Sequence, residues 1–116
     1  MIGIDVVPVA RIETILASPQ AKRFLARIFL EEELQSLSQR PISIAGYYAS
    51  KEAVVKALKC GIGDKVSFLD IYLQKDINGA PSFTLSPQAQ QHFSFASSSL
   101  SITHDNGIAI AVAIVL

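Results

Sequence analysis

The amino-acid sequence predicts an α+β fold in which one long helix packs against a small antiparallel sheet. One observation is the segment from Ile42 to Lys59, which follows a proline, ends before Gly61 and contains a single glycine as its only helix breaker. The other is the second half of the chain, where short β-rich segments alternate with turn signals. We expect the 116 residues to form one domain that spans residues 1–116.

The first forty residues predict a strand followed by shorter helices. Residues 2–7 are β-rich, and Pro8 closes this strand because it lacks a backbone donor. Residues 9–17 place apolar side chains at helical spacing before a break at Ser18-Pro19. Residues 21–38 continue an apolar stripe, which predicts one or two further helical pieces.

The long helix carries a smooth face that permits close packing. Alanine recurs there every four residues, so that these small side chains share one side of the helix. The four alanines are Ala45, Ala49, Ala53 and Ala57. The chain then changes direction at Gly61-Ile62-Gly63.

A first hairpin is predicted after this turn. Residues 68–74 alternate between apolar and polar side chains, as in a half-buried strand. Asn78-Gly79 is a tight-turn signal that leads to a second strand near residues 82–85. Ser86 and Pro87 are typical of an N-cap and a first helical position, so we expect a short helix over residues 87–93.

A second hairpin is predicted at the end of the sequence. Residues 100–103 and 108–116 form its strands, and they flank the turn His104-Asp105-Asn106-Gly107. The last strand puts mainly alanine on one face, where a helix can lie close to the sheet. Its other face carries large apolar side chains, namely Ile108, Ile110, Val112, Ile114 and Leu116.

Composition restricts the class of protein. Half of the residues are hydrophobic and 17% are charged, which is typical of a globular chain. Ten basic and ten acidic side chains cancel, which argues against a nucleic-acid partner.

We expect no membrane segment, because the longest apolar run falls far short of about 20 residues. We also expect no export signal, since charged residues interrupt the N-terminal segment. The single Cys60 rules out an internal disulfide and suits the reducing cytoplasm.

The charges are unevenly distributed along the chain. Four basic residues, Arg11, Lys22, Arg23 and Arg27, fall in the first quarter and precede the acidic run Glu31–Glu33. On their own, both groups fit ordinary solvated helix faces.

Three short stretches contain residues that are suited to chemistry. Asp5 interrupts an apolar strand, so it must be paired, ligated to a metal or placed at an edge that faces water. Glu52 and Lys56 are four residues apart on one helix face. They fit either a surface ion pair or a metal-binding carboxylate beside an ammonium that meets phosphate. His104 follows Thr103 at a strand end, where it is either simply exposed or a donor to phosphate.

Together these stretches resemble, in order and spacing, the holo-acyl-carrier-protein synthase family of phosphopantetheinyl transferases. Gly3–Val7 with the later Arg11 is similar to the first motif of that family. Tyr48–Leu58 resembles its central signature, in which an aromatic residue precedes Lys-Glu-Ala and then Lys-Ala. Gly61–Gly63 and Leu100–Asp105 resemble the remaining two motifs. The resemblance covers almost the whole chain and implies the fold of that family.

The resemblance implies a magnesium-dependent enzyme of fatty acid biosynthesis. Its members transfer phosphopantetheine from coenzyme A to a serine of acyl carrier protein and release adenosine 3′,5′-bisphosphate. Asp5 and Glu52 would hold the magnesium, which prefers oxygen ligands. Lys56, one turn beyond Glu52, would stabilise charge on the diphosphate or leaving group. The general base stays open between Glu52 and a magnesium-bound water that Asp5 orients.

The resemblance also implies partners. Gly61 and Gly63 would let backbone amides approach phosphate oxygens. Thr103 and His104 would meet the 3′-phosphate of the nucleotide, from a neighbouring subunit of a homotrimer. The apolar last strand suits such an assembly. Acyl carrier proteins are strongly acidic, so the four early basic residues would form a docking patch.

Two departures from the family pattern stand beside the motifs. Tyr47 occupies a position where many relatives carry an arginine, which puts one phosphate or partner contact in doubt. Lys59 stands where many relatives have glycine, and with Cys60 it reshapes the turn after the helix. The residues alone also permit a non-catalytic α+β subunit that oligomerises through its apolar sheet, or a different magnesium-dependent nucleotide transferase.

Overall fold

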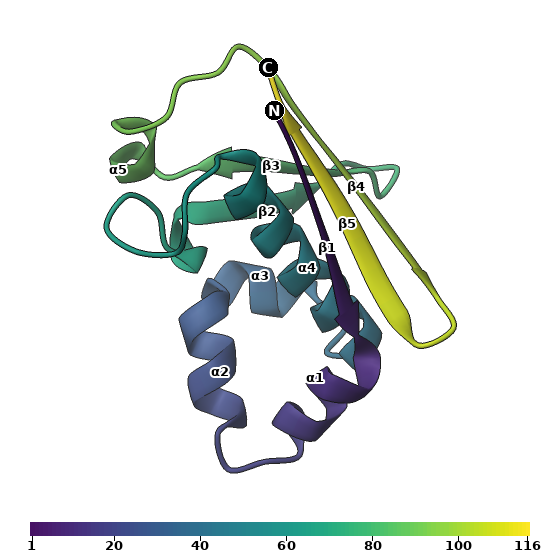
Figure 1. The fold of residues 1–116 in the computed structure, drawn as a ribbon. Coiled ribbons are helices and arrows are strands. Elements are labelled where there is room, and N and C mark those ends of the chain that lie inside the picture. The colour runs from purple at the N-terminus through teal and green to yellow at the C-terminus, as the bar shows by residue number, and fades with distance from the viewer.

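The computed structural model describes all residues from 1 to 116, and Figure 1 shows their arrangement. The elements in chain order are β1 (Ile2–Pro8), α1 (Val9–Leu16), α2 (Ala21–Ile28), α3 (Glu31–Ser36), α4 (Pro41–Ala57), the 3₁₀ helix η1 (Phe68–Asp70), β2 (Ile71–Lys75), β3 (Pro81–Leu85), α5 (Pro87–Gln90), β4 (Ser98–Asp105) and β5 (Ile108–Val115). None of the helices combines the length and the apolar character that crossing a membrane requires.

All strand pairs are antiparallel, and they form two sheets. β1, β5 and β4 make a three-stranded sheet in that order, and β2 pairs with β3. The first and last strands therefore lie side by side, which brings the two termini together at one end of the sheet (Figure 1). The α+β class with a long helix on a small antiparallel sheet is confirmed.

The helix α4 lies close to one face of the three-stranded sheet. All four alanines of its smooth face are fully buried, as are Ala109, Ala111 and Ala113 of β5. Gly3 makes this approach possible, because a Cβ there would collide with the backbone carbonyl of Ala53 and the backbone nitrogen of Ala57. The spacing of small residues in the sequence thus sets the distance between helix and sheet.

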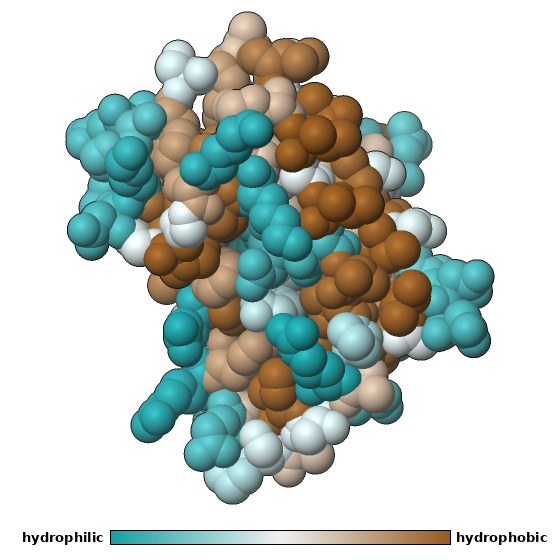
Figure 2. Space-filling view, viewed as in Figure 1, coloured by the Kyte–Doolittle hydropathy of each residue, from teal (hydrophilic) through white to brown (hydrophobic).

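The opposite face of this sheet is apolar and lies open. Ile4 and Val6 of β1 are 58% and 53% exposed, and Ile2 and Ile108 are exposed as well. Figure 2 shows apolar side chains gathered on the side of the molecule where β1 and β5 run. The predicted division of β5 into an alanine face and a large apolar face is confirmed.

The predicted strand over residues 68–74 is wrong at its beginning. Residues 68–70 form η1 because the Asp70 carboxylate accepts hydrogen bonds from the Ser67 backbone nitrogen at 2.8 Å and from the Ser67 hydroxyl at 3.0 Å. Ser86 Oγ donates to the same carboxylate at 2.6 Å. Leu69 is consequently exposed instead of sharing a buried face with the strand residues that follow.

Residues 21–38 form two helices, which agrees with the prediction of one or two helical pieces. Two other predicted boundaries shift. The short helix after the Ser86 N-cap ends at Gln90 instead of residue 93. Pro8 belongs to β1, which it can join because β1 is an edge strand.

The second hairpin also differs in detail from its prediction. β4 is longer than the predicted strand, so that His104 and Asp105 pair with β5 instead of lying in the turn. The turn is Asn106-Gly107, where both residues have positive φ.

Candidate active site

Asp5 and Lys56 meet where β1 crosses the C-terminal half of α4. Lys56 Nζ donates to Asp5 Oδ1 at 3.0 Å and to the Ile4 carbonyl at 3.1 Å. The Asp5 side chain is 15% exposed, whereas that of Lys56 is 54% exposed. The ion pair of Lys56 therefore joins helix to strand, and its partner is Asp5 instead of Glu52.

Glu52 lies beside a cluster that links α4 to α1. It shares a helix face with Tyr48, and the Tyr48 ring lies 5.7 Å from the Arg11 guanidinium. Burial raises the pKa of Tyr48, the Glu52 carboxylate raises this pKa further, and Arg11 opposes both effects. The exposed Arg11 on α1 is thus placed next to the candidate catalytic helix.

Asp5 and Glu52 are carboxylates of the kind that a hard cation binds together with oxygen atoms of a substrate. No three histidine, cysteine, aspartate or glutamate side chains gather into a metal site. Magnesium needs no such cage, because it binds through one or two carboxylates plus phosphate and retains several waters. Asp5 and Glu52, neither of them fully buried, fit that chemistry.

Gly61 and Gly63 lie in the exposed loop that follows α4. A Cβ at either position would meet no other atom within 4 Å, and neither residue has positive φ. The fold of a single chain therefore does not require glycine here, and close approach to a ligand stays a prediction.

Thr103 and His104 lie on β4 and point to opposite faces of the sheet. Thr103 pairs with Ile110 on the open apolar face, whereas His104 pairs with Ala109 on the face toward α4. His104 lines a pocket of about 240 Å³ together with Arg40, Ser43 and Lys75, and no acidic residue lines this pocket.

The structure does not unite all predicted site residues within one chain. The His104 pocket includes none of Asp5, Glu52 and Lys56. The strand β5 lies between β1, which carries Asp5, and β4, which carries His104. The predicted site residues therefore fall into two candidate half-sites on a single chain, a carboxylate half-site with Asp5 and Glu52 and a cationic one with His104, Arg40 and Lys75.

Tyr47, the first departure from the family pattern, is buried and lies beside a cation. Lys75 Nζ stands 5.4 Å from the centre of its ring, and both residues line the His104 pocket. Burial raises the pKa of Tyr47, and Glu33 raises it further. The pocket thus contains positive charge although residue 47 is not an arginine.

Lys59, the second departure, has a left-handed backbone with φ of 57° directly after the C-cap of α4. Glycine favours this conformation.

Lys51 and Glu33 form a buried ion pair that was not predicted. Lys51 Nζ lies 2.7 Å from Glu33 Oε1, and the exposed fractions of the two side chains are 0% and 4%. The prediction that the acidic run is a solvated helix face is therefore wrong for Glu33. Lys51 immediately precedes Glu52 in the central signature, but residue type and spacing do not show which carboxylate it meets.

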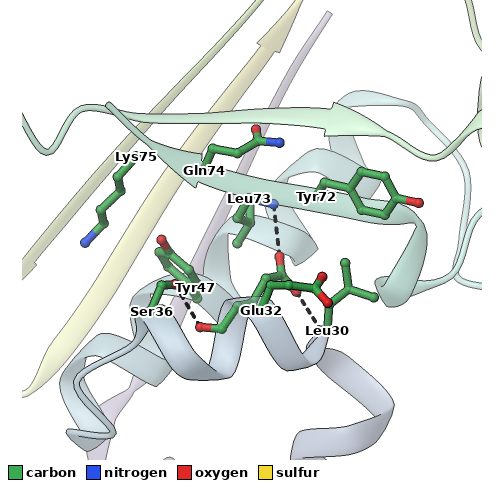
Figure 3. Close-up of a pocket in the computed structure, with 9 residues that line it drawn as sticks. Leu30, Glu32, Ser36, Tyr47, Tyr72, Leu73, Gln74 and Lys75 are labelled. Carbon is green, nitrogen blue, oxygen red and sulfur yellow. Dashed lines mark hydrogen bonds between the residues drawn. The ribbon is translucent and has the colours of Figure 1, made fainter. Parts of the chain in front are cut away.

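A groove of about 740 Å³ runs between α3 and β2 beside this ion pair. Figure 3 shows Glu32 and Ser36 on the α3 side, with Tyr72, Leu73 and Gln74 across from them. Glu33 contributes to its lining, together with Leu30, Tyr47 and Lys75.

The four basic residues of the predicted docking patch are exposed. Arg11 belongs to α1, and Lys22, Arg23 and Arg27 belong to α2. Arg27 lies in the last turn of α2, where a positive side chain also interacts favourably with the helix dipole.

Comparison with known proteins relates the chain to one family. Residues 1–113 match the 4′-phosphopantetheinyl transferase superfamily. A holo-[acyl-carrier-protein] synthase of Wolinella succinogenes is 50% identical over 97% of this chain and 93% of its own length. One from Helicobacter pylori is 46% identical over 99% and 96%. The crystal structure of a Helicobacter pylori holo-[acyl-carrier-protein] synthase in complex with coenzyme A superimposes with a TM-score of 0.94 at 45% identity, with 100% of both chains covered.

Proposed function

Because the chain belongs to the 4′-phosphopantetheinyl transferase superfamily, we infer that it transfers 4′-phosphopantetheine from coenzyme A to a serine of an apo-acyl carrier protein. The observation that carries this function is the Asp5–Lys56 pair beside Glu52, because these residues lie within the motifs that resemble the family. The chain is then an enzyme of the holo-[acyl-carrier-protein] synthase type, and we place it in fatty acid biosynthesis.

The reaction exchanges a phosphoric anhydride bond of coenzyme A for a phosphate ester bond to serine. The serine oxygen forms a bond to the β-phosphorus of coenzyme A, while the bond from this phosphorus to the bridging oxygen breaks. The hydroxyl loses its proton, and adenosine 3′,5′-bisphosphate leaves with the electron pair of the broken bond. Such a transfer depends on in-line positioning and on neutralisation of charge.

Residues of this chain are suited to both requirements. Asp5 and Glu52 would hold a magnesium ion, which supplies positive charge to the diphosphate when it is bound. Lys56 would leave Asp5 and donate to a phosphate oxygen, since its half-exposed ammonium is free to change partners. Gly61 and Gly63 would offer backbone amides to the diphosphate.

The nucleotide end of coenzyme A would occupy the His104 pocket of a neighbouring subunit. His104, Arg40 and Lys75 provide donors for a phosphate monoester, and the carboxylate half-site lies elsewhere on the same chain. The exposed apolar face of β1 and β5 would be covered by copies of the chain in a homotrimer. Thr103, which lies on that face, would then approach the shared site.

The carrier would dock on the exposed basic residues of α1 and α2. Arg11 is the nearest of them to the chemistry, because it packs on Tyr48 next to Glu52. An acidic carrier that contacts Arg11 would therefore present its serine close to the diphosphate.

Intact mass spectrometry tests this function directly. The purified chain is incubated with coenzyme A, magnesium and an apo-acyl carrier protein, and we expect the carrier to gain the mass of one phosphopantetheine. Omission of magnesium or addition of a chelator should abolish this gain. A carrier that keeps its mass under all conditions would overturn the proposal.

A mixing experiment tests the shared site. A Glu52→Ala chain and a His104→Ala chain should each be inactive, and a mixture that has exchanged subunits should regain part of the activity. Some interfaces in the mixture would combine one intact carboxylate half-site with one intact His104 pocket. Full activity from a chain that light scattering shows to be a monomer would contradict this assembly.

A further inference from the structure

Lys51 has no part in the chemistry proposed above, although it adjoins Glu52 on α4. Its ion pair with Glu33 is buried, and such a pair contributes little net stability because removing both charges from water offsets their attraction. The presence of this pair at the centre of the molecule therefore needs a reason other than stability.

The Lys51 ammonium binds three segments that are distant in the sequence. Nζ donates at 2.8 Å to the carbonyl of Ile28, the last residue of α2, and at 2.7 Å to Glu33 on α3. It also donates at 3.0 Å to the carbonyl of Phe68, where η1 begins. These three bonds use all of its hydrogens. One ammonium therefore holds α4 against three other elements.

Glu33 extends these connections to β2. Its Oε1 also accepts from the Leu30 backbone nitrogen at 2.8 Å, and its Oε2 accepts from that of Leu73 at 2.9 Å. The bond to Leu73 spans the gap between α3 and β2 in Figure 3. Both carboxylate oxygens are thus engaged, and no buried side-chain polar atom lacks a partner.

The segments that Lys51 joins contain, or lie next to, the residues proposed for carrier docking, coenzyme binding and phosphoryl transfer. The helix α2 bears the basic residues for carrier docking, and η1 follows the loop that contains Gly61 and Gly63. The helix α4 bears Glu52 and Lys56. Transfer requires the serine and the diphosphate to meet at these side chains, and a misplacement of about 1 Å can cost about 10²-fold in rate.

We propose that Lys51 is a positioning residue that fixes α4 relative to the docking helix α2 and to the coenzyme loop. Lys51 contacts no reacting atom, and this inference rests on the proposed function. Its loss would leave each binding surface intact and change the spacing between them. The signature is therefore a fall in kcat with little change in KM for coenzyme A or for the carrier.

The first test uses Glu33→Asp, which retains both charges and withdraws the carboxylate by one methylene. The matched control is Glu32→Asp, which makes the same change at the exposed neighbour on the same helix. We expect kcat of Glu33→Asp to fall about tenfold or more, with both KM values within about threefold of the unaltered chain. Glu32→Asp should leave all three constants unchanged.

The second test removes the pair altogether with the neutral double substitution Lys51→Met, Glu33→Gln. We expect kcat, corrected for the folded fraction, to fall about 10²-fold. Hydrogen exchange should increase in residues 28–33 and 68–73 and stay unchanged in β1 and β5. Phe83→Leu, a buried substitution on β3, shows how much rate is lost through reduced stability alone.

The outcomes separate this inference from the proposed function. Normal kcat in Glu33→Asp, or a loss in the double variant no larger than in Phe83→Leu, would overturn the role of Lys51. A rise in KM without a fall in kcat would overturn it as well. If the unaltered chain transfers no phosphopantetheine, the proposed function is overturned instead. Hydrogen exchange then remains a separate test of Lys51, because normal exchange in the double variant would refute the connection between segments.

Discussion

Two lysines of α4 form ion pairs with opposite properties. Lys51 pairs with Glu33 in the interior, where every donor and acceptor of both side chains is engaged. Lys56 pairs with Asp5 at the surface, and more than half of its side chain is exposed to water. They lie five residues apart, but one faces the junction of α2, α3 and η1 and the other faces the edge strand β1.

The difference shows which pair can take part in chemistry. A saturated buried pair cannot bind a substrate without losing hydrogen bonds in a low-dielectric interior, which is costly. An exposed pair exchanges partners at little cost, because water and a ligand replace what is lost. The surface pair is therefore suited to phosphate and metal, and the buried pair to holding segments in place.

The largest contrast is expected in stability. Lys51→Met alone leaves the Glu33 carboxylate buried without its partner, and we expect it to lower the free energy of unfolding by about 3–5 kcal/mol. Lys56→Met should lower it by less than about 1 kcal/mol, since the ammonium is more than half exposed and water can solvate Asp5 in its place. Urea denaturation of both variants measures these values, and similar losses would refute the contrast.

Large losses of activity are expected at the surface pair and at Glu52. We expect Asp5→Ala, Glu52→Ala and Lys56→Met each to lower kcat/KM by at least about 10²-fold, because the two carboxylates would hold the magnesium that neutralises the diphosphate and Lys56 would donate to a phosphate oxygen. Circular dichroism must show that the variants remain folded. A folded variant with full activity would remove its residue from the proposed site.

A smaller effect is expected at the exposed basic residues of α2. The double substitution Arg23→Glu, Arg27→Glu should raise KM for the carrier about tenfold and leave KM for coenzyme A nearly unchanged. Higher salt should reduce the difference, because exposed charges are screened over about 8 Å at physiological ionic strength. If both KM values rise together, α2 is not the docking surface.

The smallest effect concerns a third lysine, Lys59, which directly follows the C-cap of α4. Lys59 has a left-handed backbone, which glycine adopts without the steric cost of a Cβ. We expect Lys59→Gly to raise the free energy of unfolding by about 0.5 kcal/mol, since relief of strain exceeds the added entropy of the unfolded chain. A lower melting temperature for this variant would show that Lys59 makes a stabilising contact.

Local pattern predicted most of the elements, because it reports local preference. Pro41 and the alanine spacing predicted α4, and Asn78-Gly79 predicted the β2–β3 hairpin. The apolar–polar alternation gave a wrong prediction where a side-chain hydrogen bond determines the backbone conformation. Asp70 converts an apparent strand into η1 by binding the Ser67 backbone, and alternation of apolar residues cannot reveal that bond.

The candidate site was predicted in part. The sequence singled out Asp5, Glu52 and Lys56, and the structure joins Asp5 to Lys56. It also named His104, but it could not show that this side chain lies in a separate pocket with Arg40 and Lys75. The sequence analysis did not single out Arg40 and Lys75, because both lie outside the motifs. Arg40 immediately precedes α4, and Lys75 is the last residue of β2.

Sequence alone was enough to identify the family, the long helix and the alanine positions that let β5 approach it. These features depend on residue type and spacing, which are read along the chain. Which lysine of α4 is buried, and which carboxylate each one meets, became known only from the folded structure. Lys51 and Lys56 have the same side chain, but burial depends on which elements surround each helix face. Those neighbours, Ile28, Glu33 and Phe68 for Lys51 and Asp5 for Lys56, come from distant parts of the chain.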